Sequence, residues 1–405
     1  MGIDHAALVE VACELVRIPS VYDPPTGRCE QPAADLLAAQ MRSFGWTPVW
    51  DEVAPGRPNV HCVIEGGSSG PTLMFEGHTD VVTEGDASQW TVDPFAGVVR
   101  DGRLHGRGSA DMKAGLTAAL FAARAVADAG PFPGRIVVAG LCDEEGMMTG
   151  AKHFVASGRM VGVDGVICCE PEAGEICTVA KGALRLRVDL HGRMAHGAMP
   201  FAGANPNRAL GALLAALVTL EAELQASAGE HEHLGRPWIT PTVVRAGEPV
   251  QMNVMPADAT AWLDVRTIPG IDHGALVAEI AARASEAGRA LGVSAEVEVL
   301  DDRPVVDVAP DAPLVRAVWD AHAAVLAESP RLGGVPGATD GTVLTSRTGV
   351  PSVVYGPGGK WIAHQVDEYV ELDDIARHAE VYVEAAQRFL RNASSRRCGP
   401  GRTTT

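Results

Sequence analysis

Histidine and carboxylate side chains, which bind divalent metals and move protons, recur just after short apolar stretches of this sequence. They are His78, Asp111, Glu144, Glu145, Glu170 and His364. Five of them follow apolar runs typical of buried strands, and Asp111 lies in the glycine-rich segment GRGSADMKAG that leads into a helical stretch. In an open α/β sheet, the carboxyl ends of the strands form the ligand-binding edge. We therefore expect these side chains to meet at one edge of a sheet.

The chemistry of this set points to metal-assisted hydrolysis. Crowded carboxylates repel one another and take up protons unless a cation compensates them. A mixture of His and carboxylate ligands suits zinc, cobalt or manganese. Two such ions that share one bridging carboxylate would use five of the six residues. The remaining carboxylate would serve as the general base for hydrolysis by water.

Each position taken alone has a simpler interpretation. His78 and Asp80, two residues apart, are more often part of a capped turn than of a metal site. Adjacent Glu144 and Glu145 usually form a solvated helix start, which the helix dipole favours. Glu170 before a proline would be an ordinary strand exit, and His364 an ordinary loop histidine. These simpler interpretations would all have to hold at once, and for this reason we prefer the metal site.

The elements that must position these residues alternate between strands and helices. Apolar runs at 59–65, 72–76, 135–141 and 165–169 are separated by helical stretches such as 112–130. This alternation predicts an α/β layered sheet that is buried on both faces. Asp4 is expected to cap the first helix. The segment 98–106 is expected to form a hairpin that turns on Asp101-Gly102.

The pattern changes from about residue 181, where KGALRLRVDLHG alternates apolar and polar residues as an antiparallel strand does. Helices are expected near 205–227 and 272–291. We expect an inserted α+β lid domain over 181–299, made of an antiparallel sheet and two helices. The first domain would comprise 1–180 and 300–392, and residues 393–405 would form a disordered tail.

Composition narrows the functional classes. A formal net charge of -18 argues against binding to nucleic acid or to an anionic membrane surface. No apolar run reaches the roughly 18 residues that span a bilayer. The acidic N-terminal stretch lacks the basic flank of a signal peptide, and the eight cysteines show no CxxC spacing. We expect a cytoplasmic protein with reduced thiols.

The ordered series GHTDVV, GRGSADMKAG, DEEG, EPE and GPGGKWIAHQVDEYV resembles a known family over roughly residues 4–392. This is the family of dinuclear zinc amidohydrolases that includes acetylornithine deacetylase, succinyl-diaminopimelate desuccinylase, aminoacylase and the glutamate carboxypeptidases. The resemblance implies a zinc-peptidase-like layered sheet with an inserted lid and dimerisation domain. It also implies two divalent ions, with zinc preferred over cobalt or manganese, and a cis peptide at Asp111-Met112.

Carried over by position, the resemblance assigns a role to each residue. His78, Asp111 and Glu170 would hold one ion, and His364, Asp111 and Glu145 the other, with Asp111 bridging. Glu144 would be the general base and then the acid. Asp80 would accept a hydrogen bond from the His78 ring.

The resemblance places further residues at the substrate and at a partner subunit. Arg266, Asn253 and Thr339, the last in the stretch 333–344, would face the substrate. His196 would complete the active site of the partner in a homodimer. We expect the lids to be joined through an exposed edge strand at 183–191.

The sequence therefore predicts a deacylase that removes the acyl group from an N-acyl amino acid and resembles acetylornithine deacetylase or the desuccinylase. A dipeptidase or carboxypeptidase with the same metal site is the alternative. A binding protein that has lost catalysis is the alternative from another class, but no ligand or base is lost here.

Overall fold

The computed structural model describes residues 2–397, which divide into two units that we treat separately. Unit 2 comprises Ala180–Val306 with Pro336–Ala338, and unit 1 is the remainder of the described chain. The sequence had indicated that the insertion ends at residue 299. In the structure it ends at Val306. The reason is that strand β14 (Ser294–Arg303) continues in the unit 2 sheet to its last residue.

Unit 1 is built on a mixed sheet with the strand order β1-β2-β6-β3-β7-β17-β8-β15, and β16 also pairs with β8. Strands β6, β3, β7 and β17 run parallel to one another. Strand β1 runs antiparallel to β2, β2 to β6, and β8 to β17. The strands of this sheet are β1 (Val49–Ala54), β2 (Arg57–Glu65), β3 (Gly67–His78), β6 (Phe132–Leu141), β7 (Gly165–Cys168), β8 (Glu175–Ala180), β15 (Val306–Asp307), β16 (Arg331–Val335) and β17 (Ser352–Val354).

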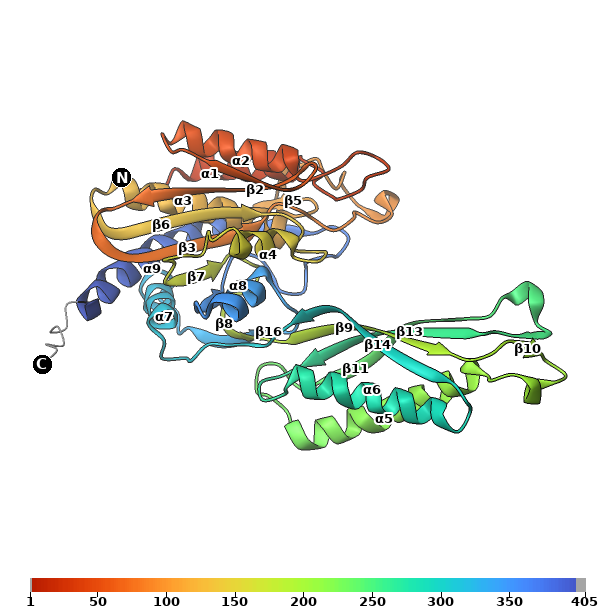
Figure 1. Cartoon of the computed structure of the whole chain (residues 1–405). Helices are drawn as coiled ribbons and strands as arrows, with labels where there is room; N and C mark the ends of the chain where they lie inside the picture. The colour runs from red at the N-terminus through yellow and green to blue at the C-terminus, as the bar shows by residue number, and fades with distance from the viewer. Residues whose placement is uncertain (1, 398–405) are drawn as a thin grey trace, which may run out of the picture. The chain divides into compact units, whose positions relative to one another are not determined.

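Helices cover both faces of this sheet, which confirms the expected α/β class (Figure 1). Residues 71–78 are all buried, and alternate side chains of a strand point to opposite faces, so both faces must be covered. Helices α3 and α9 pack on β3 and β6, and α8 packs on β7 and β17. The helices of unit 1 are α1 (His5–Val16), α2 (Gln31–Ser43), α3 (Ala114–Asp128), α4 (Thr149–Ala156), α7 (Pro313–Leu326), α8 (Asp340–Thr348) and α9 (Leu372–Arg397).

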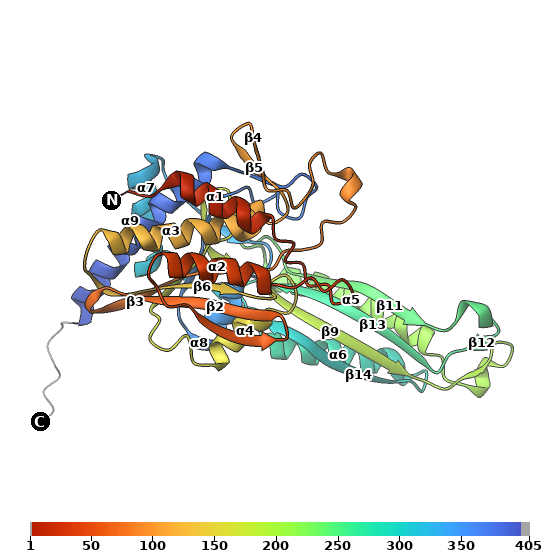
Figure 2. The same ribbon diagram turned by 90° about the horizontal axis from the view of Figure 1, so that it is seen from above.

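Local sequence signals account for several of these elements. Asp4 caps α1 by accepting the N–H of Ala7, as expected. Helix α1 then lies beside α3 (Figure 2). The expected hairpin is also confirmed, because β4 (Val98–Arg100) pairs with β5 (Arg103–His105), and β5 in turn pairs with β18 (Tyr369–Glu371). Its turn residues Asp101 and Gly102 have φ values of 53° and 76°, the left-handed conformation that such two-residue turns require.

Unit 2 contains an antiparallel sheet with the order β11-β13-β9-β14 and two helices that pack on it. Alternate residues of β9 and β13 contribute to one apolar core with leucines from α5 and α6. A short ladder of two strands, β10 and β12, lies outside this sheet. The elements are β9 (Gly182–His191), β10 (Ala195–His196), α5 (Pro206–Ala228), β11 (Trp238–Ala246), β12 (Val254–Met255), β13 (Asp258–Thr267), α6 (His273–Arg289) and β14.

Three features of the structure differ from the sequence-based expectations. The strand at 183–191 is not an edge, because β9 pairs with β13 on one side and with β14 on the other. The expected disordered tail at 393–405 was predicted to start too early in the sequence, since α9 continues to Arg397. Residues 398–405 lie outside the described residues. Helix α5 is long and apolar enough to cross a membrane by length and composition alone, although its leucines pack in the unit 2 core.

Candidate metal centre

The parallel strands of unit 1 bring the predicted residues to one edge of its sheet. His78 is the last residue of β3, and its register partner Leu141 ends β6, three and four residues before Glu144 and Glu145. Glu170 follows the end of β7, and His364 lies in the loop 355–368 after β17. The local rule that parallel strands end together therefore accounts for most of the cluster.

Asp111 lies between the two histidines. Its Oδ1 is 3.0 Å from Nε2 of His78, and its Oδ2 is 3.2 Å from Nε2 of His364. On the His78 side, Glu170 Oε1 is 3.6 Å from the same ring nitrogen. On the His364 side, Glu145 Oε1 is 2.9 Å from that ring nitrogen. Donor atoms within each of these two groups lie within 4.8 Å of one another, which suits two cations sharing the Asp111 carboxylate.

The segment that carries Asp111 is irregular. Residues 109–113 form a distorted turn of helix in which Asp111 and Met112 have non-helical backbone angles. The peptide bond between these two residues is cis, as the resemblance implied. His364 also has an unusual conformation, with a φ of 63°.

The electrostatics of the cluster show why a cation fits it. Burial raises the pKa of the Glu144 and Glu170 carboxyls well above their usual range. Burial would also raise the pKa of Asp111, but hydrogen bonds from His364 and His78 outweigh it and lower that pKa. Hydrogen bonds to Asp111 and Glu145 raise the pKa of His364 to about 10. The cluster thus needs positive charge, and the chemistry of its donors fits a divalent metal.

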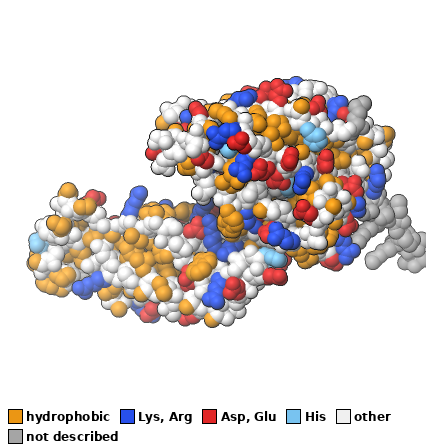
Figure 3. Space-filling view, turned by 180° about the vertical axis from the view of Figure 1, so that it is seen from behind, with side chains coloured by type: hydrophobic (Ala, Val, Ile, Leu, Met, Phe, Trp, Pro, Cys, Tyr) orange, Lys and Arg blue, Asp and Glu red, His pale blue; other side chains and the backbone are white. Residues whose placement is uncertain are grey.

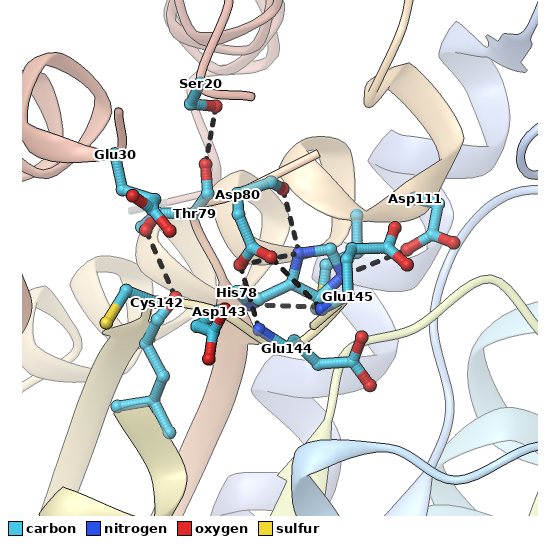
Figure 4. Close-up of polar contacts among 12 residues, drawn as sticks. Ser20, Glu30, His78, Thr79, Asp80, Asp111, Cys142, Asp143, Glu144 and Glu145 are labelled. Carbon is cyan, nitrogen blue, oxygen red and sulfur yellow. Dashed lines mark hydrogen bonds and ion pairs between the residues drawn. The ribbon is translucent and has the colours of Figure 1, made fainter. Parts of the chain in front are cut away.

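The His78 ring contacts the backbone of Asp80 and not, as expected, its carboxylate. The His78 Nδ1 lies 3.0 Å from the backbone carbonyl oxygen of Asp80 and 3.7 Å from its carboxylate. An Nδ1–H donated to this carbonyl leaves Nε2 free to bind a metal. The Asp80 carboxylate instead accepts the backbone N–H groups of Glu144 and Glu145, each at 3.1 Å (Figure 4). Asp80 therefore fixes the turn that carries the predicted base.

A second carboxylate organises the same turn and was not predicted from the sequence. Asp143 accepts hydrogen bonds from the backbone N–H and the hydroxyl of Thr149, at 3.2 and 2.6 Å. Arg57 lies 2.8 Å from Asp143 and also forms a close ion pair with the fully buried Glu30. Asp143 stands next to Glu144 in DEEG, which was the available signal, but Arg57 and Glu30 are remote in sequence.

The loop at Asp111 is likewise supported by a residue that the sequence analysis did not single out. Glu368 is fully buried and accepts the backbone N–H groups of Gly108, Ala110 and Asp111 at 2.9 to 3.1 Å. It also pairs with the buried Arg107 at 2.6 Å. Its position in HQVDEYV, close to His364, was the only hint. Glu368 thus holds the backbone from which the bridging carboxylate projects.

The remaining predicted residues lie elsewhere, and their roles stay predictions. Thr339 of unit 1 is the N-cap residue of α8, and its N–H donates to Thr342 Oγ1 at 3.3 Å. In unit 2, Arg266 pairs with Asp264 on its own strand at 2.6 Å. His196 is exposed, and its Nδ1 accepts the N–H of Ala198. The backbone of Asn253 accepts the N–H of Gly197.

Comparison with known proteins links this geometry to one family. Residues 74–388 match the profile of peptidase family M20/M25/M40. The chain is 32% identical over 395 residues to succinyl-diaminopimelate desuccinylase from Methylorubrum populi, which covers 94% of this chain and 97% of the relative. An M20 family metallo-carboxypeptidase from Sulfolobus solfataricus shares the fold with a TM-score of 0.78, 18% identity and coverage of 94% and 99%. A dinuclear metal binding M20 peptidase from Bacillus subtilis shares it with a TM-score of 0.73, 17% identity and coverage of 96% and 98%.

Proposed function

The chain belongs to peptidase family M20/M25/M40 and is a metal-dependent amidohydrolase, and we propose that it removes the succinyl group from an N-succinyl amino acid. The observation that carries this proposal is the position of Asp111 between two His and carboxylate groups, with Glu144 beside them. Among acyl groups we favour succinyl over acetyl because relatives at 32% identity over most of the chain are desuccinylases. The substrate of those relatives, succinyl-diaminopimelate, is the first compound to test.

Five residues are proposed to hold two divalent ions, with zinc favoured over cobalt or manganese. They are His78, Asp111, Glu170, Glu145 and His364. The bound ions would polarise the amide carbonyl and make water more acidic. Asp111 would hold the two ions at a fixed separation because its two oxygens face different histidines.

Glu144 would move the proton. Its carboxyl is buried, which raises its pKa and favours uptake of a proton from the attacking water. It would then give this proton to the leaving amine, so that the amide bond breaks without release of a strongly basic group. Asp80 would keep Glu144 in place through the backbone N–H that it accepts.

A hydrolysis screen tests the proposal. N-succinyl, N-acetyl and N-formyl amino acids and unblocked dipeptides would each be offered with added zinc, cobalt or manganese. We expect N-succinyl substrates, succinyl-diaminopimelate first, to give the highest kcat/KM. Preferred cleavage of dipeptides would instead identify a dipeptidase. Glu144→Gln should retain metal yet lose about 10²- to 10⁴-fold in kcat, whereas full activity in this variant would exclude Glu144 as the base.

We propose a homodimer joined through unit 2. Because β9 is an inner strand, the pairing would involve β11 or β14, the two edge strands of the unit 2 sheet. Strand β11 is an edge and exposes Trp238, Val243 and Val244, and the other edge, β14, exposes Val299 and Leu300. Hydrophobic side chains gather on the surface of unit 2 in Figure 3. Exposed apolar side chains along an unpaired strand edge favour pairing with a second copy.

His196 is proposed to complete the partner's active site. Mixing inactive His196→Ala with inactive Glu144→Gln subunits tests this directly. The mixed dimer should regain one working site, in which an intact metal centre meets an intact His196 from the partner. If subunits exchange and no activity returns, His196 does not act across the dimer.

A cytoplasmic location is also part of the proposal. Most of the described cysteines are buried and all of them are free, which suits reducing surroundings. Fractionation of cells that produce the protein at native levels would test this location, and recovery outside the cytoplasm would contradict it.

A further inference from the structure

Lys360 is a nearly buried cation close to, but outside, the proposed metal centre. Its side chain is 12% exposed. Its ammonium group lies 2.5 Å from Glu172 Oε2 and 3.3 Å from Glu175 Oε2, and it donates to the carbonyl oxygen of Gly334 at 2.8 Å. Cys177 Sγ lies 3.8 Å from the same nitrogen and donates to Glu172 at 3.3 Å. All of these residues belong to unit 1.

Glu172, Glu175 and Cys177 have the spacing of a metal site, but Lys360 occupies the space among them. Their attraction raises the pKa of the Lys360 ammonium despite its burial, with Glu172 contributing most. The cation of this cluster is therefore part of the chain. The sequence contains only four lysines, at 113, 152, 181 and 360, although Lys and Arg together number 33. An ammonium group is a more compact charge than a guanidinium, and here it lies within 3.3 Å of two carboxylates.

The contacts of Lys360 join two segments that each carry a proposed metal ligand. Lys360 lies in the loop 355–368, four residues before His364. Glu172 lies two residues after Glu170, in the connection between β7 and β8. The ion pair therefore ties the loop of one ligand to the loop of the other.

The loop 355–368 needs such a tie because it contains no helix or strand. His364 within it is half-exposed and has a positive φ, so local secondary structure does not hold its ring. The loop has other anchors, for example the Gly358 N–H bonded to Asp374 at 2.7 Å. Lys360 joins it to the Glu170 segment through a side chain, beside the backbone bond from the Ala173 N–H to the Gly358 carbonyl oxygen at 3.0 Å.

We propose that Lys360 is a positioning residue that sets the affinity of the ion held by Asp111, Glu145 and His364. This inference rests on the proposed dinuclear site but not on the identity of the substrate. Support around a metal ligand typically changes metal affinity by about 10- to 100-fold. Loss of Lys360 should therefore lower the binding affinity of the ion on the His364 side by that factor. The ion on the His78 side should bind with unchanged affinity.

The test titrates zinc into metal-free protein by calorimetry and follows cobalt by its absorption spectrum. Lys360→Met should weaken one of the two binding events about 10- to 100-fold and leave the other unchanged. The double variant Lys360→Met with Glu172→Gln removes the carboxylate left unpaired, so it should recover thermal stability but not the lost affinity. Arg159→Met is the control, because Arg159 pairs at 2.5 Å with Asp51 on β1, the edge strand of the sheet.

The outcomes separate this inference from the proposed function. Two zinc events of wild-type affinity in Lys360→Met would overturn the role of Lys360 and leave the deacylase proposal intact. Equal weakening of both events, or recovery of affinity in the double variant, would also overturn it. Wild-type protein that binds two ions yet hydrolyses no acyl amino acid would refute the substrate proposal alone. Wild-type protein that binds fewer than two ions would overturn both.

Discussion

Replacement of Asp80 by asparagine tests how the general base is held. Both oxygens of the Asp80 carboxylate accept peptide N–H groups, from Glu144 and from Glu145, and the residue is 3% exposed. An amide keeps one oxygen but turns an NH₂ group toward the other N–H, so at least one hydrogen bond is lost. A hydrogen bond to a charged acceptor contributes about 1.5–3 kcal/mol. If the lost hydrogen-bond energy raises the activation free energy because Glu144 is held less firmly in the transition state, kcat falls about 10- to 150-fold.

The assay is steady-state hydrolysis of the best acyl amino acid at saturating metal, together with zinc calorimetry. We expect Asp80→Asn to lower kcat with little change in KM and to weaken the ion on the Glu145 side. Asp86→Asn is the control, since Asp86 is exposed and accepts the N–H of Ser88 at 3.0 Å in a similar local turn. A kcat within about threefold of wild type, or a selective loss of the His78-side ion, would refute this reasoning.

Three further predictions concern the metal and the buried polar groups. Chelation should abolish hydrolysis and lower the thermal midpoint while far-UV circular dichroism stays nearly unchanged, and unchanged hydrolysis would rule out a metal requirement. Glu368→Gln leaves Arg107 buried without its carboxylate and should cost about 3–5 kcal/mol in urea unfolding, whereas a loss below about 1 kcal/mol would contradict this. Burial and the nearby His378 lower the pKa of His322, so below about pH 6.5 the unfolded chain binds a proton that the folded chain does not. Wild type should then lose up to about 1.4 kcal/mol per pH unit more than His322→Asn as the pH falls, and equal losses would argue against it.

Much of the metal cluster was predictable because its ligands follow strands that the sequence shows clearly. An apolar run such as 72–76 predicts a buried strand, and the carboxyl ends of parallel strands meet, so no distant contact has to be known. The turn at Asp101-Gly102 was predictable for a similar reason, since its conformation depends on two adjacent residues.

The support of the cluster was not predictable, because it depends on contacts between remote segments. The N–H groups that the Asp80 carboxylate accepts belong to the turn after β6, whereas Asp80 itself follows β3. Arg57, which contacts Asp143, comes from a third strand, β2. Sheet order poses the same difficulty. Alternation in 183–191 identifies a strand with one buried face, but it does not tell whether one or two strands flank it.

The position of unit 2 within the chain has a consequence for the order of folding during synthesis. Strands β16 and β17, which pair with β8 and β7, follow unit 2 in the sequence, so the ribosome must make all of Ala180–Val306 before they can join. Closing so long a loop is entropically costly while the insert is unfolded. Strands β8 and β15, at the two ends of the insert, are neighbours in the sheet. An insert that folds first would bring these ends together, and we expect nascent chains to acquire protease resistance in unit 2 before the metal-binding edge exists.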